Sequence, residues 1–270
     1  MKKILSIALV VVLSLSLLTG CGGTSDVNGD ASSIIIGVSS EPHASLVELV
    51  VEELKEEGVE VQIVEFTDYV TPNTSLDDGD IDANFFQHKP YLEDFVENQG
   101  MKLKSLGGVH IEPMALYSTS IASIEDLKDG AEISIPNDNV NGGRALLLLE
   151  ANGLIKLSAD AGLNATEKDI IENPKNLKIN PLEAAFLPRT LDEVDAAIIN
   201  GNYALEAGLN PVNDGLIIED ADSPYVNVVV VRDGEEDEEK FTKLLSALQS
   251  DKVKTYIEDN YNGGVVAAFN

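Results

Sequence analysis

Ring-bearing side chains gather in the stretch Asp80–Leu92, and their chemistry suits an apolar binding surface. Four of them fall within seven positions, although aromatic residues make up only 5% of the chain: Phe85, Phe86, His88 and Tyr91. Residues Ile81–Phe85 are predicted to form a strand, and Pro90 suits the first turn of a following helix. Neighbouring strand residues face opposite ways, so one phenylalanine is expected in the core. Because open α/β folds bind ligands at the carboxyl ends of strands, the other rings predict a ligand-facing wall.

Arg144 is the residue best suited to hold an anion. It follows Asn141, Gly142 and Gly143, close to the predicted start of a helix over Ala145–Ala151. A guanidinium there would offer a two-pronged hydrogen-bonding group to a carboxylate, and the helix N–H dipoles would add to the attraction. The alternative is a surface arginine paired with one of the 47 acidic residues of the chain. The anion site is the favoured interpretation, and the ion pair remains open.

Asn202 and Asn227 are candidates for holding a polar head group. Each lies at the end or the start of a predicted strand, where a side-chain amide could accept hydrogen bonds from an ammonium group. For Asn202 the competing interpretation is a turn, because Asn200-Gly201-Asn202 has a turn-like composition. Asn227 lies inside an apolar run, where a polar side chain needs a partner.

The sequence offers little for metal binding or catalysis. The three histidines, His43, His88 and His110, are far apart and lack the spacing of zinc sites. The chain contains neither a Gly-x-Ser-x-Gly nucleophile motif nor a glycine-rich phosphate loop. We therefore expect no metal, no cofactor and no enzymatic activity, with a secreted metal-dependent enzyme that uses His88 and nearby acids as an alternative.

The first residues predict export and lipid anchoring. Lys2 and Lys3 precede an apolar run, Ile4–Leu18, which is shorter than the ~20 residues that a membrane-spanning helix needs. Leu18-Thr19-Gly20-Cys21 resembles the bacterial lipobox, in which the cysteine becomes the lipidated first residue. We predict a signal peptide over residues 1–20, lipidation of Cys21, the only cysteine, and a flexible tether over residues 21–33. The protein is expected on the extracytoplasmic face of the cell membrane.

The charge of the chain excludes some partners. Its formal net charge is −29, and removal of residues 1–20 takes away two lysines, which gives −31. A chain this acidic has no basic face with which to neutralise phosphates, so we expect no nucleic-acid binding. It would not bind an anionic membrane by charge either, so the lipid must provide the anchor.

The order of predicted elements indicates an α/β protein with two lobes. Residues 34–66 read as strand, helix and strand, and the alternation restarts after Ser123, with a further helix expected near residues 165–172. Proline interrupts extended segments at Glu112-Pro113 and at Pro224, which marks two candidate crossings between lobes. We assign residues 34–112 plus 225–270 to lobe 1 and residues 113–224 to lobe 2. Each lobe is a sheet flanked by helices, and a ligand would lie between them.

Six motifs along the chain resemble a known family. They are Thr67–Asn73, Gly79–Leu92, Ile135–Asp138, Gly143–Leu149, Glu172–Lys178 and Asp222–Asn227. Together with the lipobox, they resemble the NLPA-type methionine-binding lipoproteins of ABC importers. The resemblance implies a type II-like periplasmic-binding-protein fold that captures methionine and delivers it to a permease and its ATPase. It also implies a monomer attached to the membrane through Cys21.

The resemblance also implies roles for single residues. Tyr69, Phe86, His88 and Tyr91 would surround the methionine side chain, Arg144 would bind the carboxylate, and Asn141, Asn202 and Asn227 would contact the head group. A thioether is apolar and polarizable, and it packs well against aromatic rings. One departure is that the family usually has a proline in the loop that here reads Asn137-Asp138-Asn139-Val140-Asn141. A methionine derivative, a methionyl dipeptide, or a surface interaction role remain alternatives.

Overall fold

The computed structural model describes residues 32–220 and 223–269. The predicted signal peptide, the lipidation site Cys21 and tether residues 21–31 lie outside the described residues. The tether prediction is wrong at its last two residues, because strand β1 (Ser32–Val38) begins at Ser32. The N–H of Ser32 donates to the carbonyl oxygen of Gly58 at 3.0 Å, and Ser32 and Ser33 pair with β2. Their backbone groups are satisfied by the sheet, which fixes them in extended form.

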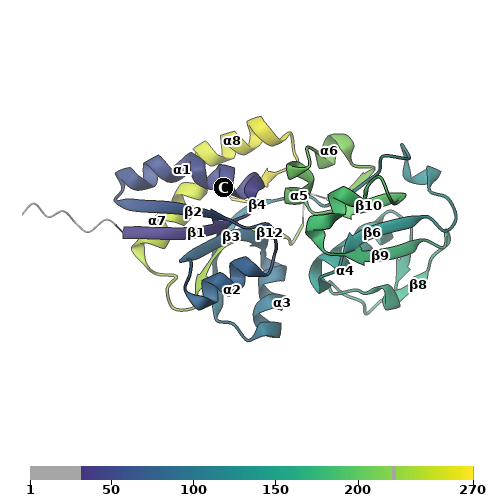
Figure 1. Cartoon of the computed structure of the whole chain (residues 1–270), viewed down its shortest axis with the longest axis horizontal. Coiled ribbons are helices and arrows are strands. Elements are labelled where there is room, and N and C mark those ends of the chain that lie inside the picture. The colour runs from purple at the N-terminus through teal and green to yellow at the C-terminus, as the bar shows by residue number, and fades with distance from the viewer. Residues whose placement is uncertain (1–31, 221–222, 270) are drawn as a thin grey trace, which may run out of the picture. The chain divides into compact units, whose positions relative to one another are not determined.

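The first sheet has six strands in the order β13-β4-β12-β3-β1-β2 (Figure 1). The other five strands of this sheet are β2 (Val59–Glu65), β3 (Ala83–His88), β4 (Leu103–Ile111), β12 (Val226–Arg232) and β13 (Val266–Ala267). Strand β1 is parallel to β2 and β3, whereas β12 runs antiparallel between β3 and β4. The strand predicted over Ile81–Phe85 is observed as β3, which begins later, at Ala83, and extends to His88.

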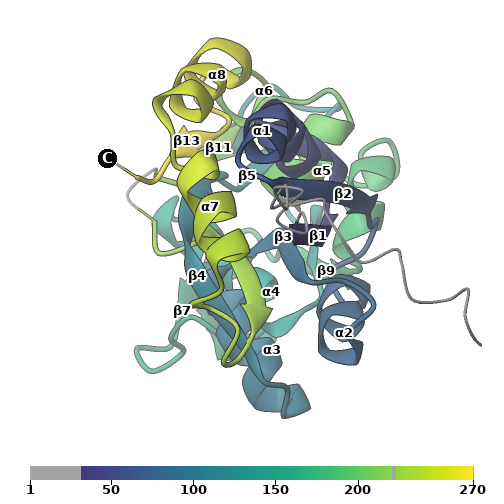
Figure 2. The ribbon, with the colours of Figure 1, turned by 90° about the vertical axis from the view of Figure 1, so that its left-hand side faces the viewer.

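Side chains alternate between the two faces of this sheet, and each face has its own helices. Ile34 and Ile36 point to the face covered by α1 (Ser45–Glu56), α7 (Glu239–Leu248) and α8 (Asp251–Tyr261). Ile35, between them, points to the face covered by α2 (Thr71–Asp78) and α3 (Lys89–Gln99). Figure 2 shows α1 and α8 on one side of the sheet and α2 and α3 on the other. This two-residue period is the reason why the apolar run 34–36 is buried on both faces.

The second sheet has five strands in the order β11-β5-β10-β6-β9. They are β5 (Ala115–Tyr117), β6 (Glu132–Pro136), β9 (Lys178–Leu182), β10 (Ala196–Ile199) and β11 (Ile217–Ile218), while β7 (Lys156–Leu157) and β8 (Ile170–Glu172) form a separate pair. The helices of this part are α4 (Asn139–Ala151), α5 (Gly201–Glu206) and α6 (Pro211–Asp214). Short helical turns occur at Ser40–Ala44, Ile124–Asp126, Glu167–Asp169 and Ala184–Thr190. The leucines of α4 pack against β6 and β10, which explains their high local density.

Two predicted helices differ from the structure. The helix expected near residues 165–172 is wrong, because only the turn Glu167–Asp169 is helical and Ile170–Glu172 form β8. The Thr166–Asp169 capping box starts the turn, but the β-branched pair that follows favours a strand. Helix α4 begins at Asn139, earlier than the predicted Ala145, because the Asp138 side chain accepts from the N–H of Asn141 and caps it. Arg144 consequently lies in the second turn, beyond the first N–H groups.

The chain changes sheets at the two proline-marked segments. Strand β4 ends at Ile111 in the six-stranded sheet, and β5 begins at Ala115 in the five-stranded one. The return lies between β11, which ends at Ile218, and β12, which begins at Val226. In the described part of the chain, no helix is long and apolar enough to span a membrane.

Candidate functional site

One cavity collects the side chains that the sequence singled out. The empty space within it, including the part open to solvent, is about 330 Å³, and its lining includes all eight predicted ligand-binding residues: Tyr69, Phe86, His88, Tyr91, Asn141, Arg144, Asn202 and Asn227. Four further residues line it: Gln87, Glu112, Asn200 and Gly201. Elements of both halves contribute to the lining. His88 ends β3 in the first sheet, whereas Arg144 belongs to α4, which packs on the second sheet.

Three rings form an aromatic wall of the cavity. The ring centroid of Tyr69 lies 6.0 Å from that of Phe86 and 5.9 Å from that of Tyr91. The hydroxyl of Tyr91 donates to the carbonyl oxygen of Tyr69 at 2.9 Å, and the hydroxyl of Tyr69 donates to Asn202 Oδ1 at 2.5 Å. Phe85 points away into the core, where it is fully buried. The alternation along β3 thus assigns one phenylalanine to the core and the other to the wall.

His88 is a neutral hydrogen-bonding group in this wall. Its Nδ1 accepts from the N–H of Tyr91 at 3.2 Å, so Nε2 carries the proton and donates to Asn141 Oδ1 at 3.0 Å. Burial lowers the pKa of His88 to about 3, and the nearby Arg144 guanidinium acts in the same direction. The metal-dependent alternative placed His88 beside acids, whereas the structure gives it an amide partner.

Arg144 is buried and held on one edge. Its Nε and Nη2 donate to the two carboxylate oxygens of Glu219 at 2.9 and 2.5 Å, and Nη2 also donates to the carbonyl oxygen of Glu112 at 2.9 Å. The guanidinium carbon lies 4.2 Å from the ring centroid of Tyr225. Among the described residues, Nη1 has no hydrogen-bond partner. Arg144 therefore has the acidic partner of the alternative interpretation, yet it lines the cavity and keeps one donor group for it.

Three asparagines carry polar groups on the second-sheet side. Asn141 Oδ1 accepts from Asn200 Nδ2 at 2.8 Å as well as from His88, and its own amide donates to Asp138. Asn200 is the cap residue of α5, and Asn202 lies in the first turn of that helix, which replaces the predicted turn. Asn200 Oδ1 and Asn202 Nδ2 are buried without a partner among the described residues. One acceptor and one donor are thus unsatisfied in the lining, where a ligand could satisfy them.

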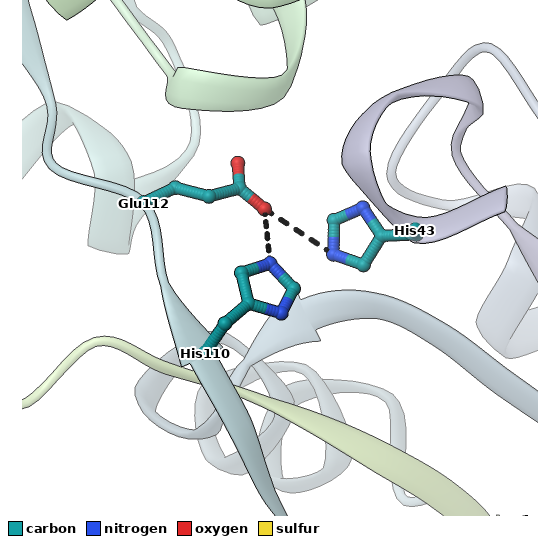
Figure 3. A group of neighbouring side chains, drawn as sticks. All are labelled: His43, His110 and Glu112. Carbon is teal, nitrogen blue, oxygen red and sulfur yellow. Dashed lines mark hydrogen bonds and ion pairs between the residues drawn. The ribbon is translucent and has the colours of Figure 1, made fainter. Parts of the chain in front are cut away.

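Glu112, His43 and His110 form a buried group that we call the Glu112 cluster (Figure 3). His110 Nε2 lies 2.7 Å from Glu112 Oε1, and His43 Nε2 lies 3.3 Å from the same oxygen. Burial lowers the pKa of His43 to about 4 and that of His110 to about 3, so both imidazoles are neutral at pH 7. Burial raises the pKa of Glu112, whereas His43, Arg144 and the Asn202 backbone act in the opposite direction.

Asn227 connects this cluster to the cavity. Its Oδ1 accepts from His43 Nε2 at 3.2 Å, and its backbone pairs with His110 and His88 on the neighbouring strands. The amide inside an apolar strand thus has the partner that the sequence required. The three histidines are far apart in the sequence and were not expected to share a site, but β4 and the turn at Ser40–Ala44 bring His43 and His110 together.

The sequence analysis missed Glu112 and Asn200 as lining residues. Glu112 is the only acidic residue in Leu103–Tyr117, and a single carboxylate in an apolar run is a signal that could have identified it. Asn200 was noted only as part of a turn-like motif. Glu219, which fixes Arg144, lies far away in sequence and had no local signal.

Comparison with known proteins agrees with this architecture. The profile of the NlpA lipoprotein family matches residues 34–269. The chain is 46% identical over 252 residues to the D-methionine-binding lipoprotein MetQ of Salmonella typhimurium, covering 92% of each chain.

Two solved structures are similar over nearly the whole described part. A nutrient-binding protein from Burkholderia cenocepacia, bound to methionine, is 47% identical, with a TM-score of 0.84 over 87% of this chain and 100% of its own. Lipoprotein Tp32 from Treponema pallidum is 46% identical, with a TM-score of 0.85 over 88% of this chain and 100% of its own. The fold is that of two-lobed periplasmic substrate-binding proteins, and the chain belongs to the NlpA lipoprotein family.

Proposed function

We propose that this protein is a receptor for methionine that delivers it to an ABC importer, without a catalytic step of its own. The observation that carries the proposal is the single cavity in which a buried guanidinium, an aromatic wall and unsatisfied amide groups meet. A free amino acid with an apolar side chain needs these three kinds of partner at once. The methionine-bound relative from Burkholderia cenocepacia supports the same ligand.

The eight predicted ligand-binding residues then take separate roles. Tyr69, Phe86 and Tyr91 pack against the thioether side chain, because sulfur makes favourable contacts with aromatic rings. His88 closes the same wall through its hydrogen bond to Asn141. Arg144 binds the carboxylate through Nη1, while Glu219 keeps its other edge fixed.

The amides complete the polar end. Asn202 Nδ2 is a donor for the carboxylate, and Asn200 Oδ1 is an acceptor for the ammonium group. Asn141 and Asn227 hold these groups and the imidazoles in place.

Isothermal titration calorimetry tests the ligand. L-methionine and D-methionine should each be titrated into the protein from residue 22 onward, with glycyl-methionine and leucine as comparison ligands. We expect one binding site per chain and a preference for methionine over leucine. Absence of heat and of a thermal shift with all methionine-containing ligands would refute the proposal.

We also propose that Cys21 carries the lipid that attaches the protein to the extracytoplasmic face of the membrane. Its relatives include membrane lipoproteins, and the lipobox resemblance of Leu18–Cys21 supports the position. Cys21→Ser should release the protein into the soluble fraction. Retention of the variant in the membrane fraction would contradict the assignment.

The division into lobe 1 (34–112 plus 225–270) and lobe 2 (113–224) remains a proposal. The two sheets support it, because their strands separate at the same two segments. We propose that the protein acts as a monomer, with its lobes closing over the ligand before it meets the permease. Small-angle scattering with and without methionine should show a smaller radius of gyration in the bound state.

A further inference from the structure

Glu112 is the only acidic side chain among the described residues that line the cavity. Its side chain is 6% exposed, and burial of a carboxylate is costly unless hydrogen bonds or an opposite charge compensate for it. Arg144 does not fill this role, because its carboxylate partner is Glu219 and it contacts Glu112 only at the carbonyl oxygen. Glu112 therefore brings to the cavity a carboxyl group that no side-chain cation of the described chain pairs with directly.

The histidines orient this carboxylate without neutralising it. His43 Nε2 faces two oxygen acceptors, Asn227 Oδ1 and Glu112 Oε1, so it must carry a proton, and Ser39 Oγ donates to its Nδ1 at 2.6 Å. His110 Nε2 donates to the same carboxylate oxygen at 2.7 Å. Figure 3 shows the two rings approaching that oxygen from different sides. Both Nε2 atoms lie beside Glu112 Oε1, so two neutral imidazoles, rather than a cation, hold this oxygen.

The second carboxylate oxygen lies beside the start of α5. A Cβ at Gly201 would be 3.0 Å from Glu112 Oε2 and 2.6 Å from Glu112 Cβ. Only glycine lets the helix come this close, and the next residues on either side are Asn200 and Asn202, whose unsatisfied amide atoms line the same cavity. The carboxylate and the Asn200 acceptor therefore belong to one part of the wall.

We propose that Glu112 is the counter-charge for the α-ammonium group of the bound amino acid, with Asn200 Oδ1 as a second acceptor. His43 and His110 are positioning residues that hold the carboxylate by hydrogen bonds. The ligand class is then an amino acid with a free ammonium group, and N-acylated or deaminated analogues are excluded. This inference rests on the proposed function, because it places a ligand in the same cavity.

The test compares two ligands in two proteins. L-methionine and 4-(methylsulfanyl)butanoate, which lacks only the amino group, are titrated into the wild-type protein and into Glu112→Gln. We expect the substitution to weaken methionine binding by about 10- to 100-fold, since charged hydrogen bonds of this kind contribute about that much. Binding of the deaminated analogue should change by less than about threefold. Glu93→Gln, which removes an exposed acid on α3, is the matched control and should leave both affinities unchanged.

Each other outcome has a distinct meaning. Equal weakening of both ligands would show that Glu112 only supports the fold, and unchanged methionine binding would refute its contact with ammonium; either result overturns the inference. A Glu112→Gln effect that disappears after treatment with a chelator would replace it with a metal site. If Glu112→Gln does not fold, the wild-type protein still decides, because an analogue that binds as tightly as methionine rules out an ammonium site. Failure of the proposed function is different, since the wild-type protein would then bind neither ligand.

Discussion

Two carboxylates near Arg144, that of the buried Glu112 and that of the half-buried Glu219, are stabilised in different ways. Glu219 forms a two-point ion pair with the guanidinium, so the charges of both groups cancel locally. Glu112 has two neutral imidazoles and the α5 backbone instead. The ion pair fixes the orientation of the guanidinium, whose Nη1 points to the ligand carboxylate in our proposal, whereas a carboxyl group held by neutral hydrogen-bond donors has no cationic partner of its own. We infer that Glu219 shapes the anion side of the site and that Glu112 forms its cation side.

Removal of the Arg144 guanidinium should have the largest effect on methionine affinity. Arg144→Ala leaves the Glu219 carboxylate without its partner and the ligand carboxylate without a donor. We expect methionine affinity to fall by more than about 1,000-fold and the free energy of unfolding to fall by about 3 kcal/mol. Calorimetry and urea unfolding measure the two effects. Unchanged affinity would show that Arg144 is only a structural ion-pair residue.

Acidification should act through the three buried imidazoles, two of which belong to the Glu112 cluster. The pKa values of His43, His88 and His110 are about 4, 3 and 3 in the folded protein, against 6.5 when unfolded. The unfolded chain therefore binds more protons below pH 6.5, so stability is fully present above that pH and is lost as the pH falls towards the folded values. The raised pKa of Glu112 opposes part of this loss.

We expect the free energy of unfolding to fall by about 3 kcal/mol between pH 7 and pH 5. Urea unfolding at both pH values provides the measurement. His110→Gln should show a smaller difference between the two pH values than the wild-type protein. Stability that does not change with pH would mean that the histidines are not held in their neutral form.

The aromatic wall should contribute next, and by a different mechanism. Phe86→Ala removes an apolar contact with the ligand side chain but leaves Arg144 and Glu112 in place. Methionine affinity should fall by about 30-fold, which corresponds to the loss of one well-packed ring. Binding of alanine, measured under the same conditions, should barely change. An equal loss for alanine would contradict a separate side-chain pocket.

Glu219→Gln should have the smallest effect and separates the two carboxylates most directly. The guanidinium loses its fixed orientation but keeps its charge, so affinity should fall by about 10-fold. L-methionine and its deaminated analogue should be weakened equally, because both carry the carboxylate that Arg144 binds. A selective loss of methionine alone would mean that Glu219, and not Glu112, receives the ammonium group.

Local patterns were sufficient to predict most elements and the aromatic half of the site. The helix predicted to follow Pro90 is confirmed as α3 (Lys89–Gln99), with Pro90 in its first turn, and Gly100 adopts a positive φ of 69° after its end. These signals come from residues within one or two turns of each other.

The remaining part depended on contacts between distant segments. Residues 165–172 carry a capping box, but pairing of β8 with β7 decides their structure. The Glu112 cluster joins the turn at Ser40–Ala44 with the end of β4, and Glu219 reaches Arg144 from 75 positions away. The spacing of residues along the sequence does not indicate which distant side chains come into contact. The sequence alone could therefore indicate only that a buried Glu112 needs a partner.

The close approach of Gly201 to Glu112 has a consequence for the evolution of the site. A side chain at position 201 would meet the Glu112 Cβ at 2.6 Å. Every residue except glycine has a Cβ, so replacing Glu112 by another residue would not relieve this contact. Relatives that lack glycine at the start of α5 must therefore displace the helix from position 112, which would also move Asn200 and Asn202 relative to the carboxyl group.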